Sequence, residues 1–199
     1  MSSAAPRQLP VASALAAADA DFDAARERLF ALLSIPSVST DPAHAGDCRR
    51  AAEWIAADLA QSGFSAAVRE TTGRPLVLAH HPGPGGNAPH VLYYGHYDVQ
   101  PPDPLDLWTS PPFSPALVDG PKGPRIVARG AVDDKGQCMT FLAAFRAWHK
   151  ATRTLPIRAT VLIEGEEEIG SPSLEPFLAA EKAKLAADVA VITDTGMWN

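Results

Sequence analysis

The sequence predicts an α/β domain in which helices pack against a largely parallel β-sheet. Three short apolar runs rich in β-branched residues, 91–94, 158–163 and 189–193, indicate buried strands. Two segments whose apolar residues recur with helical spacing, 137–149 and 174–185, alternate with these runs. Helices that alternate with strands apolar on both faces are typical of layered α/β proteins with a parallel sheet.

The N-terminal part of the sequence adds two helices before the sheet begins. Residues 1–18, rich in alanine and serine, predict a flexible tail, and the folded domain is expected over 19–199. A helix is predicted over 19–33 because its apolar residues share one face, and Pro36 stops it. The other predicted elements are a helix over 47–61, strands over 65–69 and 76–80, and a hairpin that joins 116–118 to 125–128.

The composition argues against several classes of partner and compartment. The 199 residues carry a formal net charge of -6 and no basic stripe, so we expect no nucleic-acid partner. No apolar run approaches the ~20 residues of a membrane span, and the weakly apolar stretch 10–18 runs into acidic residues, unlike a secretion signal. Cys48 and Cys138 show neither metal-type nor disulfide-type spacing, which predicts two reduced thiols in a cytoplasmic protein without a membrane partner.

Polar residues that could carry chemistry form four clusters, three of them directly after a predicted strand. In open α/β sheets this edge is where ligands usually bind. Each cluster alone has a plainer explanation, since paired aspartates can cap a helix and acidic runs are usually solvated. The clusters are Gly95-His96-Tyr97-Asp98, Arg129 to Gly136 with Asp133-Asp134, Glu164 to Ser171, and Thr193-Asp194-Thr195.

Taken together, the four clusters indicate a metal site. The spacing puts His96 and Asp98 on the same side of an extended chain, so that Asp98 can orient a metal-bound imidazole. The acidic run 164–168 would repel itself unless a cation neutralises it or one carboxylate keeps its proton. Histidine with carboxylates suits one or two divalent ions of the zinc, cobalt or manganese type, and the oxygen-rich loop of a calcium site is missing.

The ordered motifs resemble those of the co-catalytic zinc exopeptidases. That family includes carnosinases, bacterial dipeptidases, aminoacylases, acetylornithine deacetylase, succinyl-diaminopimelate desuccinylase and glutamate carboxypeptidase. The resemblance covers about residues 20–199, and the segments 95–101 and 108–113 look most like the dipeptidase branch. It implies a three-layer α/β/α catalytic domain with a mostly parallel mixed sheet, incomplete at its C-terminus.

The resemblance also implies a role for each residue of the site. The metal ligands that it implies are His96 and Asp194 on one ion, Glu168 on the second, and Asp133 as the bridge between them. Two divalent ions, Zn2+ first and Co2+ or Mn2+ as alternatives, would polarise the scissile carbonyl. Asp98 would orient His96, and Glu167 would be the general base that moves a proton from the metal-bridging water to the leaving amine. The Asp133–Asp134 peptide bond is expected to be cis.

The sequence departs from this family after Asp194. The family completes its catalytic domain with a later segment that supplies a histidine to the second metal, and it carries an inserted lid domain that dimerises. The histidines that match no metal position, and that we expect in loops or at the surface, are His44, His80, His81, His90 and His149. We therefore expect a truncated portion of a protein that is a homodimer at full length, and the portion alone is expected to be a poor catalyst.

Three functions follow from these observations. The leading prediction is a metal-dependent hydrolase that cleaves the amide bond of dipeptides. A deacylase acting on N-acyl amino acids would use the same metals with a different substrate pocket. An inactive fragment that serves as a binding or assembly module is the alternative outside the enzymes; the missing histidine favours it, whereas Glu167 argues against it because a structural metal needs no base. The exact substrate is not encoded in these residues.

Overall fold

The computed structural model describes residues 10–196, in which helices alternate with short strands. The helices are α1 (Val11–Ala20), α2 (Phe22–Leu33), α3 (Ala45–Ala60), α4 (Lys135–Thr152) and α5 (Leu174–Leu185). The strands are β1 (Ser65–Arg69), β2 (Leu76–His81), β3 (His90–His96), β4 (Ala116–Val118), β5 (Arg125–Val127), β6 (Arg158–Glu164) and β7 (Val189–Ile192). Short 3-10 turns are η1 (Pro42–His44), η2 (Leu105–Leu107) and η3 (Glu167–Ile169).

The main sheet has the strand order β1-β2-β6-β3-β7. β3 pairs in parallel with β6 and β7, whereas β2 runs antiparallel to both β1 and β6. The predicted α/β fold is confirmed, but only half of the sheet is parallel, because the short segment 70–75 between β1 and β2 allows only an antiparallel return. β7 is an edge strand on which Val189 and Ile192 are 55% and 62% exposed.

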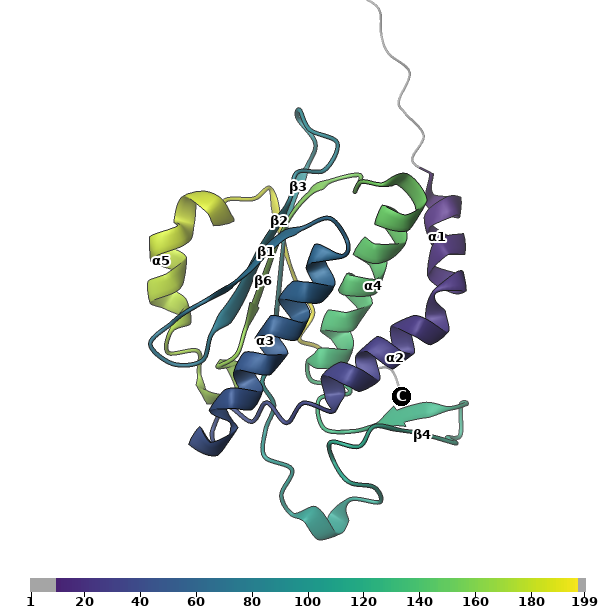
Figure 1. The fold of residues 1–199 in the computed structure, drawn as a ribbon, viewed down its shortest axis with the longest axis vertical. Coiled ribbons are helices and arrows are strands. Elements are labelled where there is room, and N and C mark those ends of the chain that lie inside the picture. The colour runs from purple at the N-terminus through teal and green to yellow at the C-terminus, as the bar shows by residue number, and fades with distance from the viewer. Residues whose placement is uncertain (1–9, 197–199) are drawn as a thin grey trace, which may run out of the picture.

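Helices cover both faces of this sheet, as Figure 1 shows. α3 and α4 lie on one face and α5 lies on the other, while α1 and α2 pack against the outer side of α4. Alternate residues of the strands supply the two cores: Val77, Val161 and Ile163 pack toward α3 and α4, and Leu78 and Leu162 pack toward α5. None of the described helices combines the length and the apolar character that a membrane crossing requires.

The predicted flexible tail is wrong for residues 11–18, which belong to helix α1. Alanine has the highest helix propensity, and the small side chains of α1, with Ala14 buried, let this helix lie close against α4. The predicted helix over 19–33 is in fact divided, because the chain bends at Asp21 before α2 begins. Residues 1–9 of the predicted tail lie outside the described residues.

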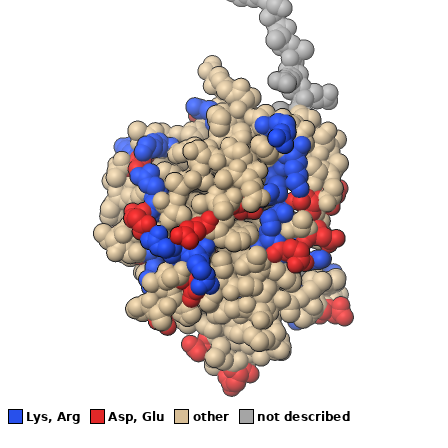
Figure 2. All heavy atoms as spheres, viewed as in Figure 1, with Lys and Arg blue, Asp and Glu red and all other residues tan. Residues whose placement is uncertain are grey.

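A buried ion network anchors this bend to the rest of the domain. Asp21 accepts hydrogen bonds of 2.5 Å from both Arg28 and Lys150. Arg28 also lies 3.9 Å from Asp58, which accepts a hydrogen bond of 2.5 Å from Arg146. The network therefore joins the α1–α2 junction to α3 and α4. Acidic and basic side chains also lie side by side on the surface shown in Figure 2.

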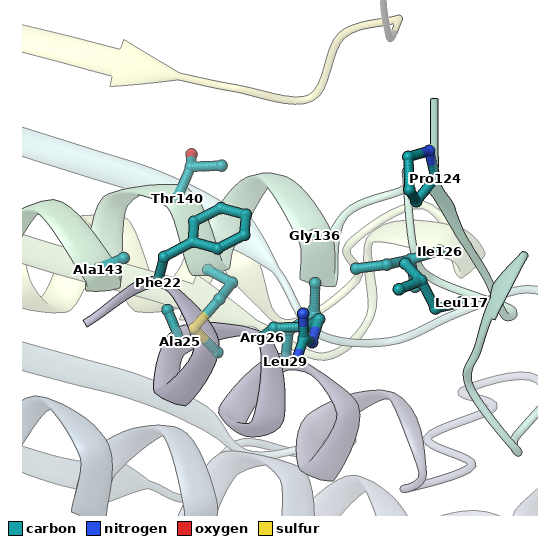
Figure 3. A pocket seen from close by; sticks show the side chains of 11 residues that line it. Phe22, Ala25, Arg26, Leu29, Leu117, Pro124, Ile126, Gly136, Thr140 and Ala143 are labelled. Carbon is teal, nitrogen blue, oxygen red and sulfur yellow. The ribbon is translucent and has the colours of Figure 1, made fainter. Parts of the chain in front are cut away.

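An apolar groove lies between α2, α4 and the β4–β5 hairpin (Figure 3). Its volume is about 480 Å³, and the residues that line it include Phe22, Leu117, Ile126 and Met139. Phe22 and Leu117 are 68% and 50% exposed, so no described segment covers them. The two cysteines, by contrast, are free and buried in the core.

The Asp21 network generates a prediction about stability and pH. Asp21→Asn is expected to lower the free energy of unfolding near neutral pH by about 2 kcal/mol, because two cations lose their charged partner. Burial alone would raise the pKa of Asp21, but the hydrogen bonds from Lys150 and Arg28 outweigh it and hold the pKa below its usual value. Such a group stabilises the fold above its unfolded-state pKa of about 4, and the stabilisation is lost as the pH falls through the native pKa.

Urea unfolding of both proteins, near neutral pH and again near pH ~3, measures this difference. The difference should shrink at the lower pH. Asp23→Asn is the matched control, since Asp23 pairs with Arg26 at 3.2 Å but its side chain is 84% exposed. Equal stabilities of the two variants at neutral pH would contradict the role given to Asp21.

Candidate metal centre

The predicted polar clusters converge at one edge of the main sheet, where the parallel strands end. His96 is the last residue of β3 and lies opposite Glu164, the last residue of β6. Asp194 follows β7, and Glu167 and Glu168 lie in η3, directly after β6. The Asp133-Asp134 cluster precedes α4, which begins at this lower edge of the sheet in Figure 1. Three of these segments meet because β6, β3 and β7 are neighbours in the sheet, and the start of α4 adds the fourth.

His96 is the centre of the site and is fully buried. Its Nδ1 lies 3.1 Å from the Asp98 carbonyl oxygen, an arrangement that leaves Nε2 as the free ring atom. That Nε2 faces three carboxylates: Asp133 at 3.0 Å, and Glu167 and Asp194 at 3.9 Å each. A ring nitrogen lone pair beside three acceptor groups is unfavourable unless a proton or a metal cation lies between them.

The donor atoms of this cluster fit a divalent metal. His96, Asp133 and Asp194 each offer one ligand atom, and these atoms all lie within 4.8 Å of one another. One imidazole nitrogen with carboxylate oxygens is a common ligand set for catalytic zinc. No lysine or arginine in the described part of the chain forms an ion pair with these carboxylates or with Glu167 and Glu168. The Asp133–Asp134 peptide bond is cis, as the resemblance implied.

The unneutralised charge alters the protonation of the site. Burial alone would lower the pKa of His96, but the Asp98, Asp134 and Asp133 carboxylates outweigh it and raise the pKa to about 10. Burial also raises the pKa of Glu167, with the neighbouring carboxylates adding to the rise and His96 opposing it. In the absence of a cation, the cluster therefore takes up protons to relieve its own repulsion.

Asp98 connects His96 to the acidic turn, which is more than the orienting role predicted for it. Its carbonyl oxygen contacts the imidazole, and its carboxylate Oδ1 lies 3.4 Å from Nδ1 of the same ring. The carboxylate oxygens of Asp98 also accept hydrogen bonds from the backbone N–H groups of Glu167 at 3.2 Å and Glu168 at 3.1 Å. One fully buried aspartate thus fixes both the histidine and the turn that carries two predicted site residues.

The acidic run divides into structural and exposed members. Glu164 is buried and accepts hydrogen bonds from Tyr94 at 2.5 Å and Ser171 at 2.9 Å. Glu166 is also buried, and its carboxylate accepts backbone N–H groups of Arg74 at 2.9 Å and Ser173 at 3.1 Å. The next two glutamates differ from them: the Glu167 carboxylate lies 3.9 Å from His96, and the Glu168 carboxylate accepts a hydrogen bond from Gln100. The buried carboxylates are satisfied by uncharged donors, which explains how so many acidic groups occupy one edge.

Two buried residues beside the predicted ligands were not assigned by the sequence reasoning. The Asp134 carboxylate accepts hydrogen bonds from the backbone N–H of His96 at 3.1 Å and from the Cys138 thiol at 3.2 Å. Lys135 is fully buried, and its Nζ donates to the carbonyl oxygens of Leu32 at 3.1 Å and Ile35 at 2.6 Å. Asp134 and Lys135 connect the Asp133 segment to β3 and α2. Their position directly after Asp133 in the sequence could have identified them.

The other histidines take no part in this cluster, as expected. Their predicted placement in loops or at the surface is wrong for His81, which is buried in β2 and packs edge-on against Phe64. His80 lies in the same strand, with its Nδ1 3.0 Å from the Thr160 hydroxyl. Strand β2 carries both because its two faces are covered.

Sequence and fold both match known peptidases. The pattern described as Peptidase family M20/M25/M40 matches residues 92–199, which contain every residue of the candidate centre. The chain belongs to this peptidase family. It is 34% identical to the Cys-Gly metallodipeptidase dug1 of Schizosaccharomyces pombe over 183 residues, or 84% of this chain. The predicted resemblance to a peptidase family with dipeptidase members is thereby confirmed.

Two solved dipeptidase structures share the fold of this M20/M25/M40 chain. Human carnosine dipeptidase 1 superposes with a TM-score of 0.86 and 29% identity over 97% of this chain. The di-peptidase Dug1p from Saccharomyces cerevisiae gives a TM-score of 0.82 and 28% identity over 92% of this chain. The chain spans only 37% of the fission-yeast relative and 42% and 41% of these two structures. The activity of a whole relative therefore does not transfer to this chain by likeness alone.

Close backbone contact at Gly136 generates a prediction about the segment that carries Asp133. A Cβ at Gly136 would lie 1.9 Å from the Ala131 carbonyl oxygen, which is backbone and cannot rotate away. Gly136→Ala is expected to lower the free energy of unfolding by about 3 kcal/mol, because the loop before α4 must shift. Gly46→Ala is the control: it meets no atom within 4 Å in α3 and should raise stability by about 0.5 kcal/mol. Thermal unfolding compares them, and an undiminished unfolding temperature for Gly136→Ala would contradict the crowding.

Proposed function

We propose that this chain contributes most of the metal centre of a metal-dependent dipeptidase, as the N-terminal part of its catalytic domain. The observation that carries the proposal is the arrangement around His96, whose Nε2 faces Asp133, Glu167 and Asp194 with no lysine or arginine neutralising them in the described residues. A structural carboxylate would be paired with hydrogen-bond donors of the protein, as Glu164 is with the Tyr94 hydroxyl and Glu166 is with the Arg74 N–H. This one is left open, as a cation site requires.

The residues divide between two ions in this proposal. His96 and Asp194 would hold the first ion, Glu168 would hold the second, and Asp133 would be shared between them. Zn2+ is the favoured ion and Co2+ or Mn2+ are alternatives, because the donor set is one nitrogen with several oxygens. When bound, such ions polarise a scissile carbonyl and stabilise the negative charge that develops on its oxygen. Among the described residues the second ion would have two protein ligands, fewer than the three usual for catalytic zinc.

Glu167 is the proposed general base. Its backbone N–H is fixed by Asp98, while its carboxylate is one-third exposed and lies 3.9 Å from His96. A carboxylate held in place but not consumed by a hydrogen bond can accept a proton from the attacking water and return it to the leaving amine. Its raised pKa favours both transfers, since the best proton shuttle has a pKa near the working pH.

Dipeptides are the proposed substrates because the named relatives are a Cys-Gly metallodipeptidase and a Beta-Ala-His dipeptidase. Hydrolysis of N-acyl amino acids is the second candidate, since it would use the same metals and the same base. We further propose that the full-length protein is a homodimer, which the resemblance supports. We also propose that it is cytoplasmic, which the two free cysteines support.

Metal binding is the first prediction of this proposal. Adding Zn2+ to metal-free protein is expected to raise the unfolding temperature, because a cation that binds only the folded state relieves the repulsion among the carboxylates. A chelator should reverse the rise. His96→Ala should abolish most of it, whereas His44→Ala, which removes one partner of Asp47 outside the cluster, should leave it unchanged. An equal rise in both variants would place the metal elsewhere.

Hydrolysis is the second prediction. With Zn2+ present, and with imidazole added to supply a missing nitrogen ligand, the chain is expected to hydrolyse Cys-Gly and β-Ala-His slowly. Glu167→Gln should lower the rate at least about 100-fold without weakening Zn2+ binding, because the base is lost while the ligands stay. An N-acyl amino acid cleaved in place of the dipeptides would favour the deacylase. Two bound ions with no hydrolysis of either substrate would favour a binding or assembly module.

A further inference from the structure

Gln137 lies between two segments that carry proposed ligands of the first metal. It is in the first turn of α4, is only 7% exposed, and uses its whole amide. The Nε2 group donates to the Val132 carbonyl at 3.1 Å and the Thr195 carbonyl at 2.7 Å. The Oε1 atom accepts from the Thr195 N–H at 3.3 Å and its hydroxyl at 2.9 Å. All the donors and acceptors of one primary amide are therefore engaged.

The positions of these partners in the chain are informative. Val132 immediately precedes Asp133, and Thr195 immediately follows Asp194. These two segments belong to different parts of the fold: one is the loop before α4, and the other follows β7. The Gln137 amide contacts both. One side chain thus bonds the backbone next to each of the two carboxylates.

Gln100 makes a comparable contact on the other side of the cluster. Its Nε2 donates to Glu168 Oε2 at 2.7 Å and is 3.4 Å from the Glu168 carbonyl oxygen. Gln100 is exposed and belongs to the same segment after β3 as Asp98, which holds the backbone of η3. The contact occupies one carboxylate oxygen of Glu168 and leaves the other available.

We propose that Gln137 and Gln100 are positioning residues that act on different ions, Gln137 on the first and Gln100 on the second. The inference rests on the proposed metal centre and names two residues outside its ligand set. A neutral amide suits this task, because it orients a carboxylate without cancelling the charge that attracts the cation. A lysine or arginine in the same place would form an ion pair and compete with the metal.

The test is one substitution at three places. Methionine has nearly the length of glutamine but neither donates nor accepts strongly, so Gln137→Met and Gln100→Met remove the amides with little change in volume. Gln61→Met is the matched control, since Gln61 contacts Arg146 at 3.3 Å and lies at the end of α3, away from the cluster. Calorimetric titration of the metal-free proteins with Zn2+ measures each affinity, and the Co2+ absorption spectrum reports the geometry at each ion.

Outer ligand contacts of this kind usually change metal affinity about 10- to 100-fold. Gln137→Met should lower the affinity for the tighter ion by that factor, and that for the weaker ion by less, because Asp133 is the only one of its ligands next to a Gln137 contact. Gln100→Met should lower only the affinity for the weaker ion. Gln61→Met should change neither. Because Gln137 is buried, Gln137→Glu is a second variant: it keeps the acceptor for Thr195 but sets an oxygen against two carbonyl oxygens, so it too should weaken the tighter ion.

Each outcome decides a different statement. Wild-type protein that binds no Zn2+ would refute the metal centre itself. Protein that binds only one ion, even with imidazole added to supply a third ligand to the second ion, would refute the Glu168 site and the role of Gln100. Affinities unchanged in the variants, with both ions bound by the wild type, would refute the positioning roles alone. A uniform loss at both ions together with a lower unfolding temperature of the metal-free variants would show that the amides serve only the fold.

Discussion

The parallel pairing of β3 with β6 is the constraint on which the candidate centre depends. Its register sets His96 opposite Glu164 and brings Asp98 beside the turn that follows β6. A shift of one residue would turn His96 from the inside of the site to the other face of the sheet. The core fixes this register, because Tyr93 and Val161 are paired, fully buried and packed under α3 and α4. Apolar packing thus determines where the charged groups meet.

Uncharged donors hold most of the negative charge at this edge. The carboxylates of Asp98 and Glu166 accept hydrogen bonds from backbone N–H groups. Glu164 accepts them from hydroxyl groups, and Glu168 accepts one from a side-chain amide. This arrangement orders the carboxylates without neutralising them, so their mutual repulsion remains in the metal-free chain. Three basic residues, Arg28, Arg146 and Lys150, pair instead with Asp21 and Asp58, where they join helices. The fold separates charges that stabilise it from charges that can attract a cation.

Much of this architecture could be predicted from the sequence, and the failures have physical causes. Buried strands and the order of the motifs are local patterns, and the prediction placed His96, Asp133 and Asp194 together correctly. Helix α1 was missed because its small side chains give no clear apolar stripe. The separate roles of Glu164 and Glu167 depend on burial, which neighbouring positions in a run of glutamates do not reveal. The role of Gln137 could not be predicted, because its hydrogen-bond partners are brought to it only by the tertiary fold.

The position of β7 at the edge of the sheet has a consequence for how this chain behaves in solution. In the described part of the chain no strand pairs with the outer side of β7, and its exposed Val189 and Ile192 add apolar surface. Such an edge is a template for another strand, and no proline, charge or bulge within Val189–Ile192 guards against it. A second chain that added a strand to this edge would lie a few residues from Asp194. Self-association of the chain would then limit access to the cation site.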